Sequence, residues 1–98
     1  MTGDKFDKCT NRILCLCKSI LNSKSKEYAT NDRLHNFKAA ASLQKTSPRK
    51  ALAGMMVKHT VSVYDMCRDD QDYPPELWDE KIVDSINYLL LLRALVEE

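Results

Sequence analysis

Two carboxylates near the C-terminus have the spacing best suited to chemistry. Glu80 and Asp84 lie four residues apart in a stretch with helical periodicity, so they fall on one helix face, one turn apart. Such a pair can share a hard divalent cation such as Mg²⁺ through its oxygens, or can simply be solvated. Metal-dependent phosphohydrolases built on helices usually collect more carboxylates, from facing helices. Glu80 and Asp84 therefore predict a Mg²⁺ site only if the protein is an enzyme, and the sequence predicts no other cofactor.

A lysine in the middle of an apolar helix is the next candidate. Lys58 precedes Asp65 by seven residues and shares a helix face with it. It either pairs with Asp65 through Arg68 or Lys81, or contacts a phosphate inside a pocket, because an unpaired lysine is costly to bury.

Aromatic and imidazole side chains have two interpretations as well. Tyr28, the one large apolar residue of a polar loop, either holds that loop against the core or stacks on a ligand. His35 and Asn36 follow this loop directly, so their polar side chains can face a ligand that the loop holds. His59 lies on an apolar stripe, and we expect it to be a core histidine whose ring nitrogens are satisfied.

The sequence pattern predicts four helices, and these helices must position the candidate residues. Apolar spacing predicts helices over 4–23, 33–44, 48–68 and from 75 or 76 to the end, with a polar loop over 22–32 and an acidic turn over 68–75. Asn31 or Asp32 can cap the second helix, and Ser47 with Pro48 is a strong start signal for the third. We therefore predict a single all-α domain over residues 1–98, a compact bundle of about four helices.

The apolar stripes indicate which helix faces are buried. The predicted core sides are Phe6, Cys9, Ile13, Leu16 with Cys17, and Ile20 in the first helix, Leu34, Phe37 and Ala41 in the second, Leu52, Met55, Met56, His59, Val63 and Met66 in the third, and Trp78, Ile82, Ile86, Leu89 and Val96 in the fourth. The run 88–92 is apolar all the way round, so it must be buried on more than one side. This favours a homo-oligomer that completes the bundle.

Charge and composition limit the kinds of partner. The net charge of the 98 residues is +1, but residues 1–50 carry eleven Lys/Arg against four Asp/Glu, and residues 51–98 carry four against ten. Oppositely charged faces can pack within an oligomer, or the basic half can attract phosphates. The sequence has no Arg-rich stripe with interleaved aromatics, so it does not indicate binding to duplex nucleic acid. No apolar run is long enough for a membrane span. The four cysteines lack metal spacing and the N-terminus lacks an apolar signal core, so we expect a cytoplasmic protein.

The order of these segments resembles a group of small phage and prophage proteins of the nucleotide-modification-associated domain type. The similarity covers about residues 26–92, and its motifs are Glu27-Tyr28, Leu34 to Phe37, Ser47-Pro48, Ala53 to Lys58 and Trp78 to Tyr88. The last helix is also similar to the closing helix of MazG-like all-α NTP pyrophosphohydrolases, which hold Mg²⁺ with paired acids on two helices. Here the first helix has no Glu, and Glu80 and Asp84 are spaced by four.

The resemblance implies a protein that binds a nucleotide or cyclic oligonucleotide and holds it intact, as a sponge for an immune signal of an infected bacterium. Phosphates need Lys or Arg, and bases need aromatic stacking. The expected ligand-binding residues are Tyr28, Arg33, His35, Asn36, Phe37, Lys58, Asp65, Trp78, Lys81, Asp84 and Tyr88. Two alternatives stay open: a Mg²⁺-dependent MazG-like pyrophosphohydrolase that uses Glu80 and Asp84, and an inhibitor that binds a host protein.

Overall fold

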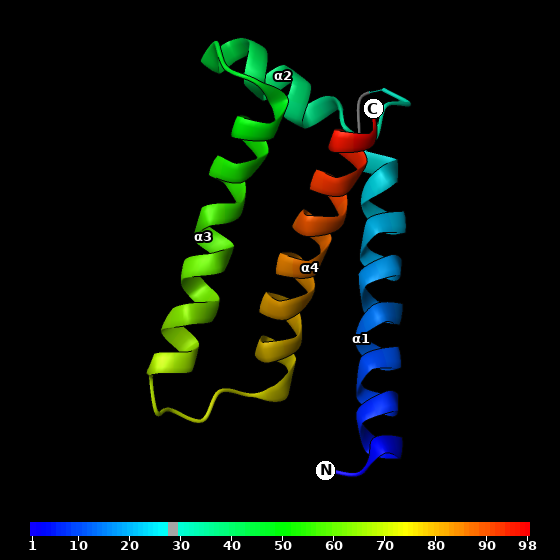
Figure 1. The fold of residues 1–98 in the computed structure, drawn as a ribbon, viewed down its shortest axis with the longest axis vertical. Coiled ribbons are helices and arrows are strands. Elements are labelled where there is room, and N and C mark those ends of the chain that lie inside the picture. The colour runs from blue at the N-terminus through cyan, green and yellow to red at the C-terminus, as the bar shows by residue number, and fades with distance from the viewer. Residues whose placement is uncertain (28–29) are drawn as a thin grey trace.

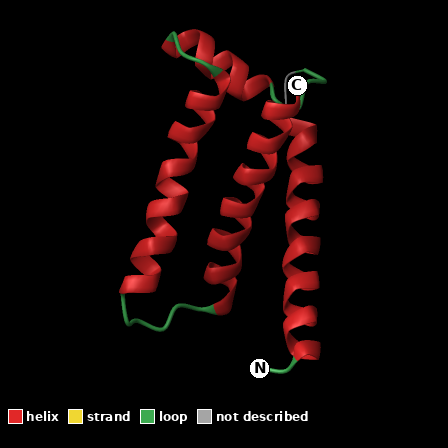
Figure 2. Cartoon of the chain, viewed as in Figure 1, coloured by secondary structure: helices red, strands yellow, loops and turns green. Residues whose placement is uncertain are grey.

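The computed structural model describes residues 1–27 and 30–98, so Tyr28 lies outside the described residues. In the described part, helices follow one another without a strand (Figure 2). They are α1 (Gly3–Lys24), the short 3₁₀ turn η1 (Ser25–Glu27), α2 (His35–Gln44), α3 (Pro48–Arg68) and α4 (Pro75–Glu97). The prediction of an all-α bundle of about four helices is confirmed.

The three long helices lie side by side, with α4 in the middle (Figure 1). α3 and α4 form an antiparallel hairpin, while α1 runs parallel to α4 on its other side, and α2 crosses the end of the bundle near the C-terminus. Among the described residues, α4 packs against both α1 and α3, whereas the backbones of α1 and α3 do not come close to each other. The central helix therefore needs apolar side chains on more than one side.

Local hydrogen bonds explain where the helices begin and end. Ser47 Oγ accepts from the Lys50 N–H at 3.3 Å, and Pro48 occupies the first turn of α3, as expected. The second helix begins at His35, two residues later than expected, because Asp32 Oδ1 accepts from the Leu34 N–H at 2.9 Å and holds 32–34 in a turn. α2 ends where Lys45 takes a left-handed conformation, with φ at 54°.

The main hydrophobic cluster lies at the end of the bundle that α2 crosses. Its buried members come from the loop before α2 and from three helices: Leu34, Phe37, Leu52 and Leu95, with Met55, Tyr88, Leu91 and Leu92 packed against them. Phe37 is thus both a core residue and the anchor of α2. The cluster fixes the relative positions of α2, α3 and α4, and these helices surround the candidate site.

The predicted core side of α4 is wrong. Val83, Asn87 and Leu95 are its buried residues, whereas Ile82, Leu89 and Val96 are 36%, 56% and 47% exposed. The fourth helix has apolar residues on two opposite sides, and periodicity cannot tell which side the rest of the chain covers. The side that contacts α1 and α3 also carries Asp84, Asn87 and Tyr88.

The cysteines do not form a common environment. Cys17 is buried against the other helices, and this burial raises the pKa of its thiol. Cys9, Cys15 and Cys67 are exposed, and all four cysteines are free thiols.

Phe6, which we expected in the core side of the first helix, is 58% exposed, because it lies near the N-terminal end of α1. No helix in residues 1–27 or 30–98 combines the length and apolarity needed to cross a bilayer.

Candidate functional site

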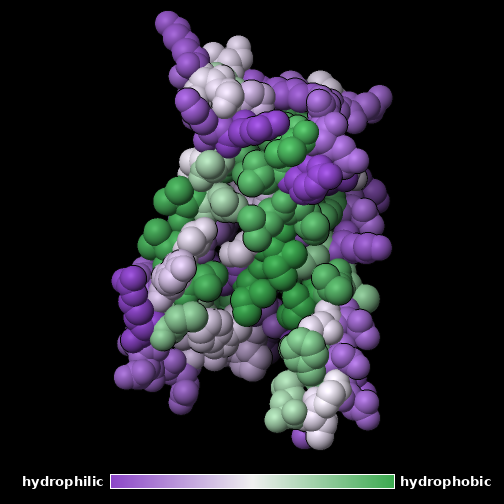
Figure 3. All heavy atoms as spheres, in the orientation of Figure 1, coloured by the Kyte–Doolittle hydropathy of each residue, from purple (hydrophilic) through white to green (hydrophobic). Residues whose placement is uncertain are grey.

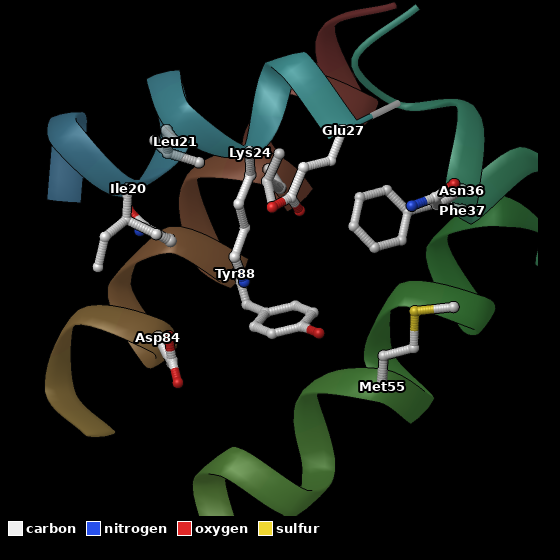
Figure 4. A pocket seen from close by; sticks show the side chains of 11 residues that line it. Ile20, Leu21, Lys24, Glu27, Asn36, Phe37, Met55, Asp84 and Tyr88 are labelled. Atoms are coloured by element: carbon white, nitrogen blue, oxygen red, sulfur yellow. The ribbon is translucent and has the colours of Figure 1, made fainter. Parts of the chain in front are cut away.

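The candidate site is a pocket of about 250 Å³ that a single chain builds from all four helices and η1 (Figure 4). Its walls come from the C-terminal end of α1, from the first turn of α2, and from the facing sides of α3 and α4. The lining residues are Ile20, Leu21, Lys24, Glu27, Asn36, Phe37, Met55, Asp84, Asn87, Tyr88 and Leu91. The bundle therefore builds a pocket without residues from a second copy.

Four of the residues predicted from the sequence meet in this pocket. They are Asn36 and Phe37 from the start of α2, and Asp84 and Tyr88 from the middle of α4. The rings of Phe37 and Tyr88 meet edge to face, with centroids 6.5 Å apart and planes at 63°. Together with the thioether of Met55 they form an apolar wall beside polar groups of Asn36 and Asp84 (Figure 4).

His59 supports this wall from α3. Its Nδ1 lies 3.7 Å from Asp84 Oδ2, and its ring stacks on Tyr88 at a centroid distance of 4.9 Å. The side chains of His59 and Asp84 are 18% and 24% exposed, so the contact is largely shielded from water. His59 is thus a half-buried histidine packed on Tyr88 with a carboxylate nearby, and the two residues form an ion pair only when the imidazole is protonated.

Two charged residues of the pocket were missed in the sequence. Lys24 ends α1 and Glu27 ends η1, and both exposed side chains point into the hollow (Figure 4). Both lie in the stretch predicted to be a polar loop, and Glu27 belongs to a motif of the resemblance but was not predicted to bind a ligand. The site forms because α1 runs parallel to α4 and brings this end beside α2. The basic charge of residues 1–50 is the one sequence signal that pointed to this wall.

Asn87 is the buried polar residue of the pocket. It is 6% exposed, and its Nδ2 donates to the Cys17 carbonyl at 3.3 Å, joining α4 to α1. No donor within the described residues pairs with its Oδ1. Asn87 follows Asp84 by three residues and shares a helix face with it, so this polar pair was a usable signal for the pocket.

Other predicted residues lie outside the pocket. Arg33 donates from Nη2 to the Leu21 carbonyl at 2.9 Å and lines a second, more open hollow of about 570 Å³ beside α1 and α4. His35 is half-buried at the first position of α2. Trp78 packs edge to face on Tyr73, with ring centroids 6.1 Å apart, at the opposite end of α4 from α2.

The charged residues of α3 and of the first half of α4 are not brought together either. Lys58 and Asp65 are exposed, and neither makes an ion pair within the described residues, so the expected bridge through Arg68 or Lys81 is not formed. Lys81 is half-buried and does not line the pocket.

The predicted Mg²⁺ pair is divided between two environments. Asp84 lines the pocket beside His59, whereas Glu80 is exposed and lies outside the pocket. Over residues 1–27 and 30–98, no group of three or more His, Cys, Asp or Glu side chains is close enough to hold a metal ion. The carboxylates that share the pocket are Asp84 and Glu27, from different elements.

Comparison with known proteins does not assign the chain to a family. The chain matches no protein-family model, no curated protein and no solved structure. The resemblance to phage proteins and to MazG-like enzymes therefore stays a hypothesis, and the pocket geometry carries the functional argument.

Proposed function

We propose that the protein binds a nucleotide in the pocket between α1, α2, α3 and α4 and holds it without hydrolysing it. The observation that carries this proposal is that residues predicted to bind a ligand meet in one pocket. Asn36, Phe37, Asp84 and Tyr88 come from two distant parts of the chain, were selected as ligand-binding residues from the sequence, and line one hollow. Ligand pockets typically combine such an apolar wall with a few polar groups.

Each wall of the pocket suits a different part of a nucleotide. Phe37, Met55 and Tyr88 offer an apolar surface on which a base packs. Asn36 can donate to and accept from a base edge, and the carboxylates of Glu27 and Asp84 can accept from amino or ribose hydroxyl groups. Lys24 supplies the cation for a phosphate.

The size of the pocket limits the ligand. Its volume of about 250 Å³ is slightly below the roughly 300–1,000 Å³ of typical ligand pockets. It suits one base with its sugar, and the phosphates would then lie outside the hollow, over Lys24. A cyclic oligonucleotide would place one of its nucleotide units in the pocket of a chain and leave the rest of its ring outside.

The resemblance to small phage proteins favours a biological role for such binding. This role is sequestration of a nucleotide immune signal in the cytoplasm of an infected bacterium. A protein with this role releases its nucleotide unchanged, whereas an enzyme releases products. The proposal includes neither duplex nucleic acid nor a membrane as partner.

A Mg²⁺-dependent pyrophosphohydrolase is the second candidate. One specific observation favours it: two carboxylates from different elements, Glu27 and Asp84, line the same pocket. Carboxylates from different elements can together bind a metal ion that assists attack on a phosphate. An inhibitor of a host protein is the third, and it predicts no small-molecule binding.

A capture-and-release experiment tests the proposal. The protein is incubated with NTPs, dNTPs and cyclic oligonucleotides in Mg²⁺, washed by ultrafiltration, heated, and the released compounds are identified by mass spectrometry. We expect an intact nucleotide in near-stoichiometric amount. Triphosphate depletion with monophosphate in the filtrate would replace the sponge by the enzyme, and a protein that neither binds nor consumes any of them would overturn both.

A matched pair of lysine variants then tests the pocket itself. Lys24→Gln removes the pocket cation, and Lys26→Gln removes an equally exposed lysine that does not line the pocket. Loss of a charge-assisted hydrogen bond, worth about 1.5–3 kcal/mol, weakens binding about tenfold or more in the first variant and leaves the second unchanged. Equal affinities for the two variants would contradict the assignment of the phosphate to Lys24.

A further inference from the structure

One side of α4 carries an apolar stripe that the described chain covers only in part. Ile82, Leu89 and Val96 recur every seven residues and are 36%, 56% and 47% exposed, with the half-buried Ile86 between them. Successive helical residues are about 100° apart, so this stripe lies opposite Asp84, the pocket residue of α4. Seven-residue spacing is the pattern of one helix seated against another.

The accessible surface of the chain is larger than its mass requires. It is 7286 Å², whereas a compact monomer of 11.3 kDa exposes about 5,700 Å². The excess of about 1,600 Å² exceeds the roughly 800 Å² per partner that a standard protein interface buries. Figure 3 shows where apolar side chains gather on the face drawn: over α4 and the adjoining sides of its neighbours.

We propose that this stripe, formed by Ile82, Ile86, Leu89 and Val96, is the interface with a second copy of the chain. The two α4 helices pack antiparallel across a twofold axis near Leu89, the middle residue of the stripe. A twofold contact uses the same patch on both copies, so the apolar residues around Leu89 are self-complementary. Arg93 lies on the same helix face, one turn after Leu89, and pairs with Glu97 of its own helix at 3.6 Å.

Charge along the long axis decides between antiparallel and parallel pairing. The end with the α3–α4 turn, where α1 also begins, carries nine Asp/Glu against four Lys/Arg over residues 1–12 and 65–80. The opposite end, with α2 and the C-terminus, carries eight Lys/Arg against four Asp/Glu over residues 22–50 and 93–98. Antiparallel packing sets the acidic end of each copy against the basic end of the other, whereas parallel packing sets like charges together.

This interface goes beyond the proposed function, because it leaves the pocket open. The pocket and the stripe lie on opposite sides of α4, so a dimer presents two pockets on its outer faces. Loss of the interface therefore leaves one complete pocket per chain, and a failure of the dimer and a failure of nucleotide binding are separate results.

A charge placed on the stripe tests the interface. We expect the wild-type chain to sediment at twice its mass of 11.3 kDa, and Leu89→Glu to sediment as a monomer with unchanged helical circular dichroism. Val57→Glu is the matched control, since Val57 is 57% exposed on α3, outside the stripe, and this variant remains dimeric. A monomeric wild type, a dimeric Leu89→Glu, or a monomeric Val57→Glu would each overturn the proposal.

Disulfide trapping tests the twofold axis even if Leu89→Glu does not fold. In a background where the exposed Cys9, Cys15 and Cys67 are replaced by Ser, Leu89→Cys meets its own copy at the axis and forms a covalent dimer on mild oxidation. Val57→Cys stays monomeric on a denaturing gel. Trapping through position 57 but not through position 89 would overturn the placement of the axis.

Discussion

His59 on α3 faces Asp84 on α4, with Nδ1 of the imidazole 3.7 Å from Oδ2 of the carboxylate. Tyr88, one turn after Asp84, stacks on the same imidazole at 4.9 Å. A residue that does not line the pocket thus holds two residues that do. His59 therefore joins the polar wall of the pocket to its apolar wall. Because His59 holds the side chain at position 84 in place, a change of charge there alters ligand binding without moving the pocket walls.

Asp84→Asn separates binding from turnover. The variant keeps the size of the side chain and its contact with His59, but it removes the negative charge, so an acceptor for ligand amino or hydroxyl groups becomes weaker. We expect affinity for the captured nucleotide to fall about tenfold, as measured by calorimetry. Glu80→Gln, at the exposed acid one turn earlier that does not line the pocket, leaves affinity unchanged. If Asp84→Asn and Glu27→Gln both abolish a measured pyrophosphate release, the Mg²⁺ enzyme is the correct function.

Asn87→Leu should stabilise the fold. The amide of Asn87 is 6% exposed and makes one hydrogen bond, to a Cys17 carbonyl that the helical pattern of α1 already satisfies. An apolar residue removes the cost of the buried Oδ1, and we expect a gain of about 1 kcal/mol, roughly 4–8 °C in Tm. Asn87→Ala is the control: it leaves a cavity and lowers Tm. A lower Tm for the leucine variant would show that the amide stabilises the bundle.

The helix positions could be predicted from the sequence, but the covered face of α4 could not. Ser47 with Pro48, and Pro75 at the start of the last helix, mark boundaries by local hydrogen bonding and backbone geometry, which act within a few residues. Ile82 and Val83 are both apolar, and only the positions of α1 and α3 decide that Val83 is buried and Ile82 is not. Local signals do not contain that information.

The same distinction applies to the pocket. Asn36 and Tyr88 could be selected because each lies in a short polar-aromatic motif, Asn36 beside Phe37 and Tyr88 after Asp84. Lys24 has no motif, and it becomes a pocket residue only because the end of α1 lies beside α2 and α4. A site that forms between distant segments is therefore recoverable from sequence only in part.

The ion pair between Asp32 and Lys38 should stabilise the start of α2 only over a defined pH range. Lys38 Nζ lies 2.6 Å from Asp32 Oδ2, and with the Leu34 N–H it lowers the pKa of Asp32 below 3.8. The same bond, and a second bond to Glu98, raise the pKa of Lys38 above 10.5. The stabilisation from Asp32 is therefore present above pH 3.8 and lost as pH falls through its folded pKa. That from Lys38 is full below pH 10.5 and lost as pH rises through its folded pKa.

Lys38→Gln tests this assignment by NMR titration of the Asp32 carboxyl carbon. We expect the pKa of Asp32 to rise toward 3.8 while staying below it, because the Leu34 N–H still donates to the carboxylate. Lys45→Gln, at an exposed lysine that ends α2, leaves the titration unchanged. An unaltered Asp32 pKa in Lys38→Gln would mean that the ion pair does not persist in solution.

Gly54→Ala should stabilise α3 without changing the pocket. Gly54 lies in the interior of the helix with a negative φ, and a Cβ built on it meets nothing within 4 Å. Alanine therefore fits without strain and removes the conformational freedom of glycine from the unfolded chain, a gain of about 0.5–1 kcal/mol that thermal unfolding detects as a higher Tm. Gly3→Ala, also in open space but at the first residue of α1, has a smaller effect because helix ends fray. A Gly54→Ala protein that gains stability but no longer captures nucleotide would show that a ligand approaches α3 at this glycine, outside the pocket proposed above.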